Sequence, residues 1–432
     1  MGCGFSVCGA RGLGQYGGHG DNADDDLEND LAISPMPRRK TFYRSNSFKS
    51  GVLIKPTTLE VTLHRQEVDE DDYEEVTEAD LVVADEDEHI GEPNVFVGGG
   101  IPGVAVDEFT IEQAKYTGHS RGGRRTVSQH LWWGSRTRAG NDSMGRRKEN
   151  QDSFVVRDCF AGCDALTFVC VMDGHGAQGA YVSHFVRDRY PLHVAAALQM
   201  HVALDDDRFH STLTHETVED VFLDASCRMT TQLEEDSQLD ISVSGTTAVA
   251  LLFLTPTARL PSITPRVFIA NVGDSRAVAG VASDDGSYAA RILSTDHKPN
   301  DSVEEARIVA TNGRVFEYGV PRVWLKDIDM PGLAMSRSFG DSIATSVGVI
   351  SDPCVTELAL AAGTFVVVAS DGLWEFMPSA HVVEMCAKCV GERQDPQTTC
   401  DMLVAEALER WLDEEDVVDD ITVLYLTTPH IE

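Results

Sequence analysis

The chain is poor in basic residues. It has 35 Lys and Arg against 70 Asp and Glu, which gives a formal net charge of -35 and a sequence pI near 4.6. Because phosphate backbones are bound by clustered Lys and Arg, this balance argues against nucleic acid as a partner. Metal ions and cationic surfaces are the natural complement of so acidic a chain.

Long hydrophobic runs are also missing. No apolar run approaches the roughly 20 residues that cross a membrane, and no secretory signal is visible at the start of the sequence. We therefore expect the ten cysteines to be free thiols in a reducing compartment. Cys386 and Cys389 form a CxxC pair, but without a second pair at zinc-site spacing a structural zinc is not expected.

Two catalytic signatures do not occur in the sequence. The absence of an HCx₅R segment excludes cysteine-based tyrosine phosphatase chemistry, and the absence of GxxxxGK[ST] excludes P-loop nucleotide hydrolysis. Gly12, Gly14 and Gly17 do spell GxGxxG, but no predicted strand precedes them, so this pattern does not indicate a dinucleotide site.

The first residues fit the pattern for N-myristoylation, with Gly2 exposed after removal of Met1 and Ser6 at the required place. Cys3 is a candidate for palmitate, and a second acyl group makes membrane anchoring stable where one chain does not. The pattern predicts a chain held at the cytoplasmic face of a membrane, and otherwise in the cytosol. The alternative is a flexible, glycine-rich start that is never acylated.

Residues 1–129 are predicted to form an acidic, largely disordered extension, and residues 130–432 a folded domain. No Lys or Arg occurs between residues 66 and 114, while acidic runs occupy residues 69–72 and 85–88. Self-repulsion and a shortage of apolar residues favour disorder there. Such runs are either simply solvated or cover a basic surface on this protein or on a partner.

Residues 130–432 contain short apolar runs that favour buried strands and longer segments with helical periodicity. The predicted strands cluster in pairs, which favours stacked, mainly antiparallel sheets with helices outside over a doubly wound parallel sheet. Strands are predicted at 153–156, 168–172, 246–254, 266–272, 365–369 and 421–426, and helices at 180–200, 218–233, 302–312, 380–390 and 400–412.

The stretch 168–176 runs from an apolar strand directly into Asp173, Gly174, His175 and Gly176. An ionised carboxylate at the end of a buried strand is expensive to desolvate, so Asp173 should be paired or bound to a metal. The two glycines let the backbone approach an ion closely, and His175 between them is placed for proton transfer. This pattern is typical of a functional site.

Other carboxylates stand where apolar runs begin or end. Asp274, Asp371 and the pair Asp419–Asp420 adjoin predicted strands, and Asp152 precedes another. Several carboxylates cannot share a pocket without cations, because like charges at close range raise their pKa values until protons neutralise them. Ligands that are all oxygen select hard ions, so we expect Mg²⁺ or Mn²⁺ and not zinc or copper.

A set of motifs in this order resembles that of the PP2C (PPM) family of metal-dependent serine/threonine protein phosphatases. The resemblance extends from about Trp132 to the end of the chain. The motifs are RKENQD at 147–152, MDGHG at 172–176, SGTT at 244–247, NVGDSR at 271–276, DHKP at 296–299, AMSRSFGD at 334–341, ASDGLW at 369–374 and DDITV at 419–423.

The resemblance implies an α+β fold, an α-β-β-α sandwich of two antiparallel sheets flanked by helices. It also implies a centre of two Mg²⁺ or Mn²⁺ ions and phosphorylated proteins as substrates. By this resemblance Asp173 bridges both ions, Gly174 offers its carbonyl to one, Asp371 and Asp419 complete the other, and Asp152 acts through water. Arg147 resembles the family's phosphate-binding arginine and His175 its general acid, and Asp274 and Glu375 match a third, weaker metal site.

The implied chemistry is direct hydrolysis of phosphoserine or phosphothreonine. Two metals can lower the pKa of a bridging water and present hydroxide in line to phosphorus. Arg147 would grip two phosphate oxygens as a planar fork. His175 would protonate the departing oxygen, a step worth on the order of 10²- to 10⁴-fold, and no phosphoenzyme is required.

Three positions depart from the commonest family pattern. Gln151 stands in place of Glu, Glu375 in place of Asp, which weakens the case for a third metal, and Asp420 in place of Asn, which leaves open whether Asp419 or Asp420 is the last ligand. Two other functions remain: a membrane-tethered pseudophosphatase that binds phosphoproteins, and a phosphoesterase for small molecules. Residues 320–349 are predicted to form a loop over the site that helps to select substrates.

Overall fold

The structure is a computed structural model, and it describes residues 131–206, 208–283 and 285–428. All of them belong to one compact unit, Arg65–Glu432. The predicted acidic extension, with the acylation candidates Gly2 and Cys3, lies outside the described residues. Acylation and membrane attachment therefore stay predictions.

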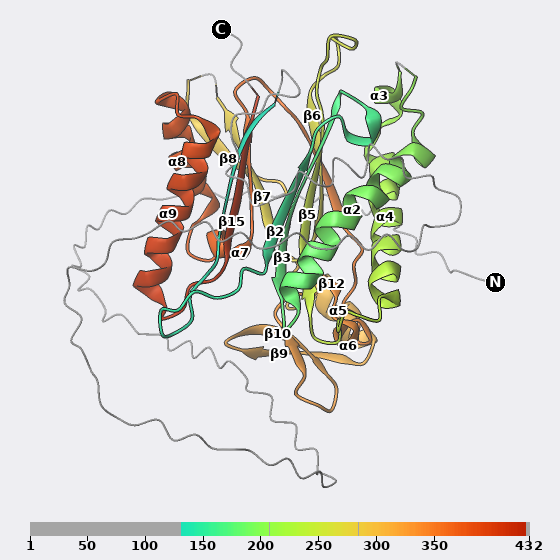
Figure 1. Ribbon diagram of the computed structural model, residues 1–432, viewed down its shortest axis with the longest axis vertical. Helices are drawn as coiled ribbons and strands as arrows, with labels where there is room; N and C mark the ends of the chain where they lie inside the picture. The colour runs from blue at the N-terminus through green and yellow to red at the C-terminus, as the bar shows by residue number, and fades with distance from the viewer. Residues whose placement is uncertain (1–130, 207, 284, 429–432) are drawn as a thin grey trace, which may run out of the picture. The chain divides into compact units, whose positions relative to one another are not determined.

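Two antiparallel sheets lie face to face (Figure 1). The first has the order β1 (Trp132–Arg138), β15 (Ile421–Thr427), β14 (Phe365–Ala369), β7 (Arg276–Ala282) and β8 (Tyr288–Ile292). The second has the order β12 (Phe339–Gly340), β4 (Gly245–Thr246), β3 (Leu166–His175), β5 (Ala248–Leu254), β6 (Arg266–Val272) and β13 (Cys354–Ala359), and β2 (Asp152–Arg157) also pairs with β3. Neighbouring strands in both sheets are antiparallel, as the sequence predicted.

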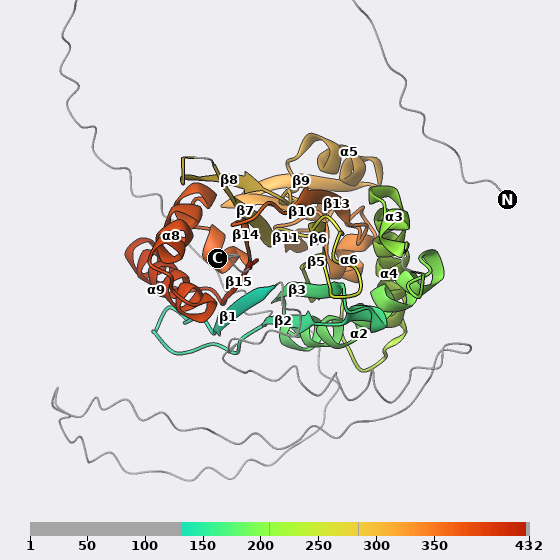
Figure 2. The same cartoon turned by 90° about the horizontal axis from the view of Figure 1, so that it is seen from above.

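Helices cover the outer face of each sheet (Figures 1 and 2). The helices α2 (Gly179–His201) and α4 (His215–Glu235) lie on the second sheet, and α8 (Ser379–Gly391) and α9 (Pro396–Glu414) lie on the first. Side-chain caps fix helix starts: Thr214 accepts the backbone N–H of Thr217, and Asp395 accepts those of Gln397 and Thr398. The α-β-β-α architecture is thus confirmed. Within the described residues, no helix has both the length and the apolar character that crossing a bilayer requires.

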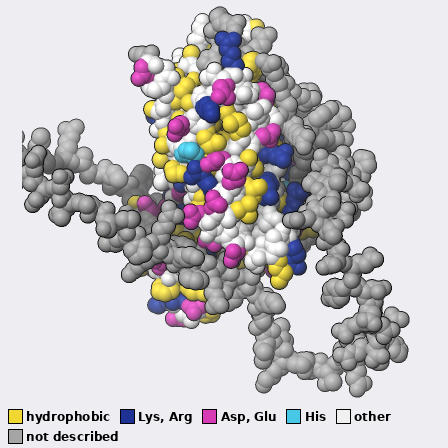
Figure 3. All heavy atoms as spheres, turned by 90° about the vertical axis from the view of Figure 1, so that its left-hand side faces the viewer, with side chains coloured by type: hydrophobic (Ala, Val, Ile, Leu, Met, Phe, Trp, Pro, Cys, Tyr) yellow, Lys and Arg dark blue, Asp and Glu magenta, His cyan; other side chains and the backbone are white. Residues whose placement is uncertain are grey.

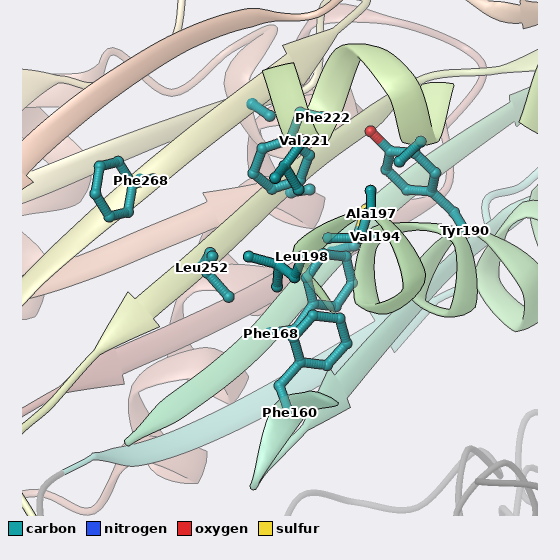
Figure 4. Close-up of a cluster of buried hydrophobic side chains, with 14 of the residues drawn as sticks. Phe160, Phe168, Tyr190, Val194, Ala197, Leu198, Val221, Phe222, Leu252 and Phe268 are labelled. Carbon is teal, nitrogen blue, oxygen red and sulfur yellow. The ribbon is translucent and has the colours of Figure 1, made fainter. Parts of the chain in front are cut away.

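Both faces of the central strands are buried, which explains their continuous apolar sequences. Alternate residues of β3 point to opposite sides. Val169 and Val171 pack between the two sheets, whereas Phe168 faces the helices and stacks on Phe160 with ring centroids 4.8 Å apart. Figure 4 shows this second cluster, in which Tyr190 of α2 lies near Phe222 of α4.

A small three-stranded sheet lies at one end of the sandwich, together with α5 (Ser302–Ala310) and α6 (Ser342–Thr345) (Figure 1). It consists of β9 (Gly313–Tyr318), β10 (Val320–Leu325) and β11 (Pro331–Leu333). The prediction of a loop over 320–349 was therefore wrong about its secondary structure. The segment folds because Val323 and Leu333 bury their side chains against Ile308 of α5.

The shorter elements connect these layers. They are η1 (Phe160–Gly162), α3 (Phe209–Thr212) and α7 (Asp371–Trp374). The helix α7 follows β14 directly and starts at a residue that the sequence singled out, Asp371.

The packing of the first sheet can be tested at Gly280. It lies opposite Phe365 on the neighbouring strand, and a Cβ at Gly280 would lie 2.1 Å from Phe365 Cζ. Because Phe365 is fully buried, we expect Gly280→Ala to lower the free energy of unfolding by about 1–3 kcal/mol, measured by chemical denaturation. Gly391→Ala is the control, since nothing lies within 4 Å of its Cβ position. Equal losses in both variants would contradict this account of the packing.

Candidate active site

Two carboxylates of the candidate site face each other across a strand pair. Asp152 at the start of β2 lies directly opposite Asp173 of β3. Like charges directly opposite on antiparallel strands repel one another. The Oδ2 atom of Asp152 accepts a hydrogen bond of 2.7 Å from Ser370 Oγ, whereas its buried Oδ1 has no partner within the described residues. Asp152 is thus held with one oxygen available for a ligand.

The first sheet brings two further carboxylates to the same place. Asp371 follows β14 and Asp419 precedes β15, and these two strands are paired neighbours. The carboxyl groups of Asp371 and Asp173 are close enough to shift each other's pKa. The charges of Asp152 and Asp419 also act on Asp173. Carboxyl groups from distant parts of the chain therefore lie within electrostatic reach of Asp173.

This crowding shifts the pKa values of the carboxyl groups upward. Burial, and then the charges of Asp371, Asp152 and Asp419, raise the pKa of Asp173 well above its usual range. Burial and Asp420 raise the pKa of Asp152 to about 7, and burial and Asp274 raise that of Asp371 to about 8. Near neutral pH these groups cannot all ionise unless a cation compensates them.

The ligand atoms available in this site are carboxylate oxygens, which hard divalent cations prefer. Within the described residues, no group of three or more His, Cys, Asp and Glu side chains already has metal-ligand spacing. The pairwise coupling of Asp173 with Asp371, Asp152 and Asp419 nevertheless places these groups within direct electrostatic reach. The individual ligand assignments stay predictions.

Glycines let the backbone pack tightly where β3 meets α2. A Cβ on Gly174 would lie 2.4 Å from Gly179 O and 2.5 Å from Gln151 O, so a larger residue does not fit. Gly176 adopts a positive φ of 84°, which favours glycine. Gly174 therefore holds Asp173 and His175 in fixed positions on either side of it.

His175 is oriented by an acidic partner. Its Nε2 lies 2.7 Å from Oδ2 of Asp341, and Ser338 Oγ donates a bond of 2.5 Å to the same oxygen. Burial alone would lower the pKa of His175, but the charge of Asp341 and its hydrogen bond outweigh burial and raise it. The imidazolium form is favoured, as a general acid requires. Asp341 was missed as a functional residue, although it ends one of the motifs described above.

The structure distinguishes Asp419 from Asp420. Asp420 is buried, and its two oxygens accept the backbone N–H groups of Gly140 at 2.7 Å and Gln151 at 2.8 Å. Asp419 is half-exposed and accepts a bond of 2.9 Å from Lys148 Nζ. Asp420 therefore fixes the backbone around the site, which favours Asp419 as the residue that faces a cation.

Gln151, the first departure from the family pattern, has a local role. Its side-chain Nε2 donates a hydrogen bond of 2.8 Å to Gly176 O. Its backbone carbonyl accepts the N–H of Gly174 at 3.1 Å. Gln151 thus links the start of β2 to the end of β3. A glutamate could not donate the hydrogen bond to Gly176 O, because an ionised carboxylate has no hydrogen to donate.

The two residues predicted for a third metal have different surroundings. Asp274 is buried and accepts a bond of 2.5 Å from Lys298 Nζ. Glu375 is exposed, and its charge acts on Arg276 and Glu415. The ammonium group of Lys298 occupies one side of Asp274, and the charges of both Asp274 and Glu375 act on Arg276. The third metal site stays a prediction.

Arg147 is exposed, and it pairs with Asn141 in an isolated β-bridge just after the turn at 143–144. Its neighbour Lys148 contacts Asp419, whereas the Arg147 side chain makes no hydrogen bond or ion pair within the residues that the structure describes. A guanidinium without an internal partner is available to bind phosphate.

Comparison with known proteins agrees with this geometry. Residues 137–414, more than half of the chain, match the sequence model of one family, described as Protein phosphatase 2C. The chain belongs to the protein phosphatase 2C family. It is 34% identical over 300 residues to Probable protein phosphatase 2C 35 of Arabidopsis thaliana, covering 64% of this chain and 78% of that protein. It is also 34% identical over 302 residues to Probable protein phosphatase 2C 48 of Oryza sativa subsp. japonica, covering 66% and 82%.

A solved structure shows that the fold is that of the family. The serine-threonine phosphatase 2C of Toxoplasma gondii superimposes with a TM-score of 0.59 and 22% identity, covering 71% of this chain and 97% of that chain. A second phosphatase from a pathogenic strain of the same organism gives a TM-score of 0.51 at 21% identity, covering 70% and 94%. The α+β sandwich predicted from the sequence is confirmed.

The raised pKa values predict how stability depends on pH in the presence of EDTA. Asp152 and Asp371 keep their protons to about pH 7 and about pH 8 in the folded protein, whereas an unfolded aspartate loses its proton near about pH 4. The free energy of unfolding should therefore fall as pH rises from about 4 to about 8. Urea denaturation at constant ionic strength measures this dependence.

Two controls accompany that measurement. Asp371→Asn should flatten the decline between about pH 6 and pH 8, because the variant lacks the group that loses its proton there. Excess Mg²⁺ should remove most of the fall in the free energy of unfolding, because the ionised carboxylates then bind the cation. A stability that rises with pH over this range in EDTA would contradict the coupling of the carboxylates.

Proposed function

We propose that this protein is a Mg²⁺- or Mn²⁺-dependent protein serine/threonine phosphatase. The observation that carries the proposal is the convergence of Asp173 from one sheet with Asp371 and Asp419 from the other, beside the His175–Asp341 pair. Membership of the protein phosphatase 2C family supports the same class of reaction.

The residues that would hold two cations surround the end of β3. The carboxylates of Asp152, Asp173, Asp371 and Asp419 and the Gly174 carbonyl would hold them. When bound, the pair supplies a nucleophilic hydroxide by lowering the pKa of a water molecule. No side chain of the protein needs to attack phosphorus, so a phosphoenzyme is not part of the proposal.

The remaining steps belong to the chain's own residues. Arg147 is available to bind two phosphate oxygens as a planar fork, which orients the phosphorus. His175, kept protonated by Asp341, gives its proton to the departing serine or threonine oxygen, which would otherwise leave as a poorly stabilised alkoxide. Asp341 then stabilises the orientation of the neutral ring until a proton returns from solvent.

Two alternatives lead to different measurements. A pseudophosphatase would bind phosphoproteins without turnover, and it normally implies a lost ligand. Here Asp152, Asp173, Asp371 and Asp419 are all retained. A phosphoesterase for small molecules would keep the same site but prefer a sugar phosphate to a phosphopeptide.

Phosphate release from a phosphothreonine peptide with Mn²⁺ tests the proposal directly. The full chain should turn the peptide over faster than a sugar phosphate, and EDTA should abolish turnover. Asp173→Asn should lower kcat by about 10³-fold or more, because it removes the carboxylate shared by the cations. Activity that survives EDTA would sink the metal mechanism, and binding without turnover would favour the pseudophosphatase.

The role of His175 predicts a dependence on the leaving group. His175→Asn should lower kcat on a phosphothreonine peptide by about 10²- to 10⁴-fold, but much less on an aryl phosphate, whose phenolate leaves without protonation. Equal losses on both substrates would argue against His175 as the proton donor.

Asp341 raises the pKa of His175, so Asp341→Asn should move the alkaline limb of the kcat profile for the phosphothreonine peptide to lower pH. Glu384→Gln, on the exposed side of α8, is the matched control and should leave the limb in place. An unshifted limb in Asp341→Asn would contradict the coupling.

A further inference from the structure

Two arginines lie on an edge strand that ends beside the candidate active site. Arg136 and Arg138 lie two residues apart on β1, so their side chains leave the same face of the strand. β1 is the edge of the first sheet. Just beyond it, the backbone N–H of Gly140 donates a bond of 2.7 Å to Asp420 Oδ1. The strand therefore ends against the backbone that supports the site.

Arg147 continues this line of positive charge. The Nη1 and Nη2 atoms of Arg138 lie 3.3 Å from Asn141 Oδ1, and Asn141 pairs with Arg147 in a β-bridge. Burial, followed by the charges of Arg147 and Arg136, lowers the pKa of Arg138. We call Arg136, Arg138 and Arg147 the arginine row.

Arg138 and Arg147 lack the acidic partners that other arginines of this protein have. Arg276 is paired with Asp296 at 2.6 Å, and Arg337 is paired with Glu304 at 2.6 Å. By contrast, Arg138 donates to the neutral oxygens of Ala139, at 2.9 Å, and of Asn141.

The two other members of the row are no better neutralised. Arg136 has only a long ion pair of 3.8 Å with the half-exposed Asp401, and the Arg147 side chain has no partner within the described part of the chain. The acidic neighbour Asp419 is already engaged by Lys148. The row therefore keeps a local excess of positive charge.

This arrangement is unusual in a chain with twice as many acidic as basic residues. Charge is segregated on the face formed by α8 and α9, where Lys and Arg side chains gather along the right-hand margin of the view in Figure 3 and more Asp and Glu lie in the middle. Like charges held together without counter-ions are destabilising unless an anion binds them. The row therefore has the chemistry of an anion site.

We propose that the arginine row is a subsite for a second acidic group of the phosphoprotein substrate, a carboxylate or a phosphate within a few residues of the phosphoserine or phosphothreonine. This inference rests on the proposed function. Arg147 lies nearest the candidate site and binds the reacting phosphate. Arg138 and then Arg136, spaced by about 7 Å along the strand, bind anionic groups that lie about two residues apart in an extended peptide.

Two phosphothreonine peptides of equal length test the subsite. One carries Glu at two positions on each side of the phosphothreonine, and the other carries Gln at the same positions. The full chain should hydrolyse the Glu peptide with a kcat/KM about fivefold higher, the upper range for one exposed charge pair. The preference should shrink as ionic strength rises.

Arg138→Gln should bring the ratio of the two kcat/KM values close to one, and Arg138→Lys should keep most of the preference because it keeps the charge. The matched control is Arg291→Gln, on the exposed β8 at the opposite edge of the same sheet, which should keep the full ratio. Equal thermal midpoints for the variants exclude misfolding as the cause.

The outcomes separate the subsite from the proposed function. If neither peptide is hydrolysed, the phosphatase proposal fails. If the wild-type chain hydrolyses both equally, only the subsite is wrong. A higher kcat/KM of Arg138→Gln on the Glu peptide would also overturn the subsite, because it would mean that acidic runs of the chain itself, at residues 69–72 and 85–88, occupy the arginine row and exclude substrate.

Discussion

The mutual repulsion of carboxylates that meet from both sheets is the constraint on which the proposed function depends. Asp152, Asp173 and Asp371 are brought together by strands that are fixed by their own packing, so the acids cannot move apart to relieve the repulsion. Only protons or cations can neutralise them. In the proposed function, the stability of the two apolar sheets would thereby hold these acids together for hard cations to bind.

The antiparallel sandwich supplies the geometry for this arrangement. In an antiparallel sheet, each strand begins at the end of the sheet where its neighbour stops. Residues far apart in the sequence therefore meet at that end without long loops. Asp173 comes from one sheet, and Asp371 and Asp419 adjoin paired strands of the other. His175 and Asp341 lie at the same end of the sandwich, although they are separated by 166 positions in the sequence. At the border of this group of acids, Lys148 contacts Asp419 and Lys298 contacts Asp274.

The sequence predicted the elements with continuous apolar runs, because such runs have few alternatives to burial. β6 and β14 occur at the predicted bounds, and the predicted helices are all present. The strands β1, β7 and β8 were not predicted. Edge strands such as β8 expose most of their residues and lack a clear apolar pattern, and β7, although buried, consists mainly of Ala, Gly and Val and has no run of large apolar residues. Among the site residues, Asp173 stood out because its neighbours are buried strand residues, whereas the pairing of His175 with Asp341 depends on loop geometry that no local pattern encodes.

The position of β15 has a consequence for the synthesis of the protein. This strand is among the last described residues, yet it lies between β1 and β14 inside the first sheet. β1 therefore has no partner in its sheet until the C-terminal strand is made, and Asp419 arrives with that strand. Chains that are cut or stalled before residue 419 lack an acid of the cluster and a central strand, which leaves the facing backbone groups of β1 and β14 without their partner.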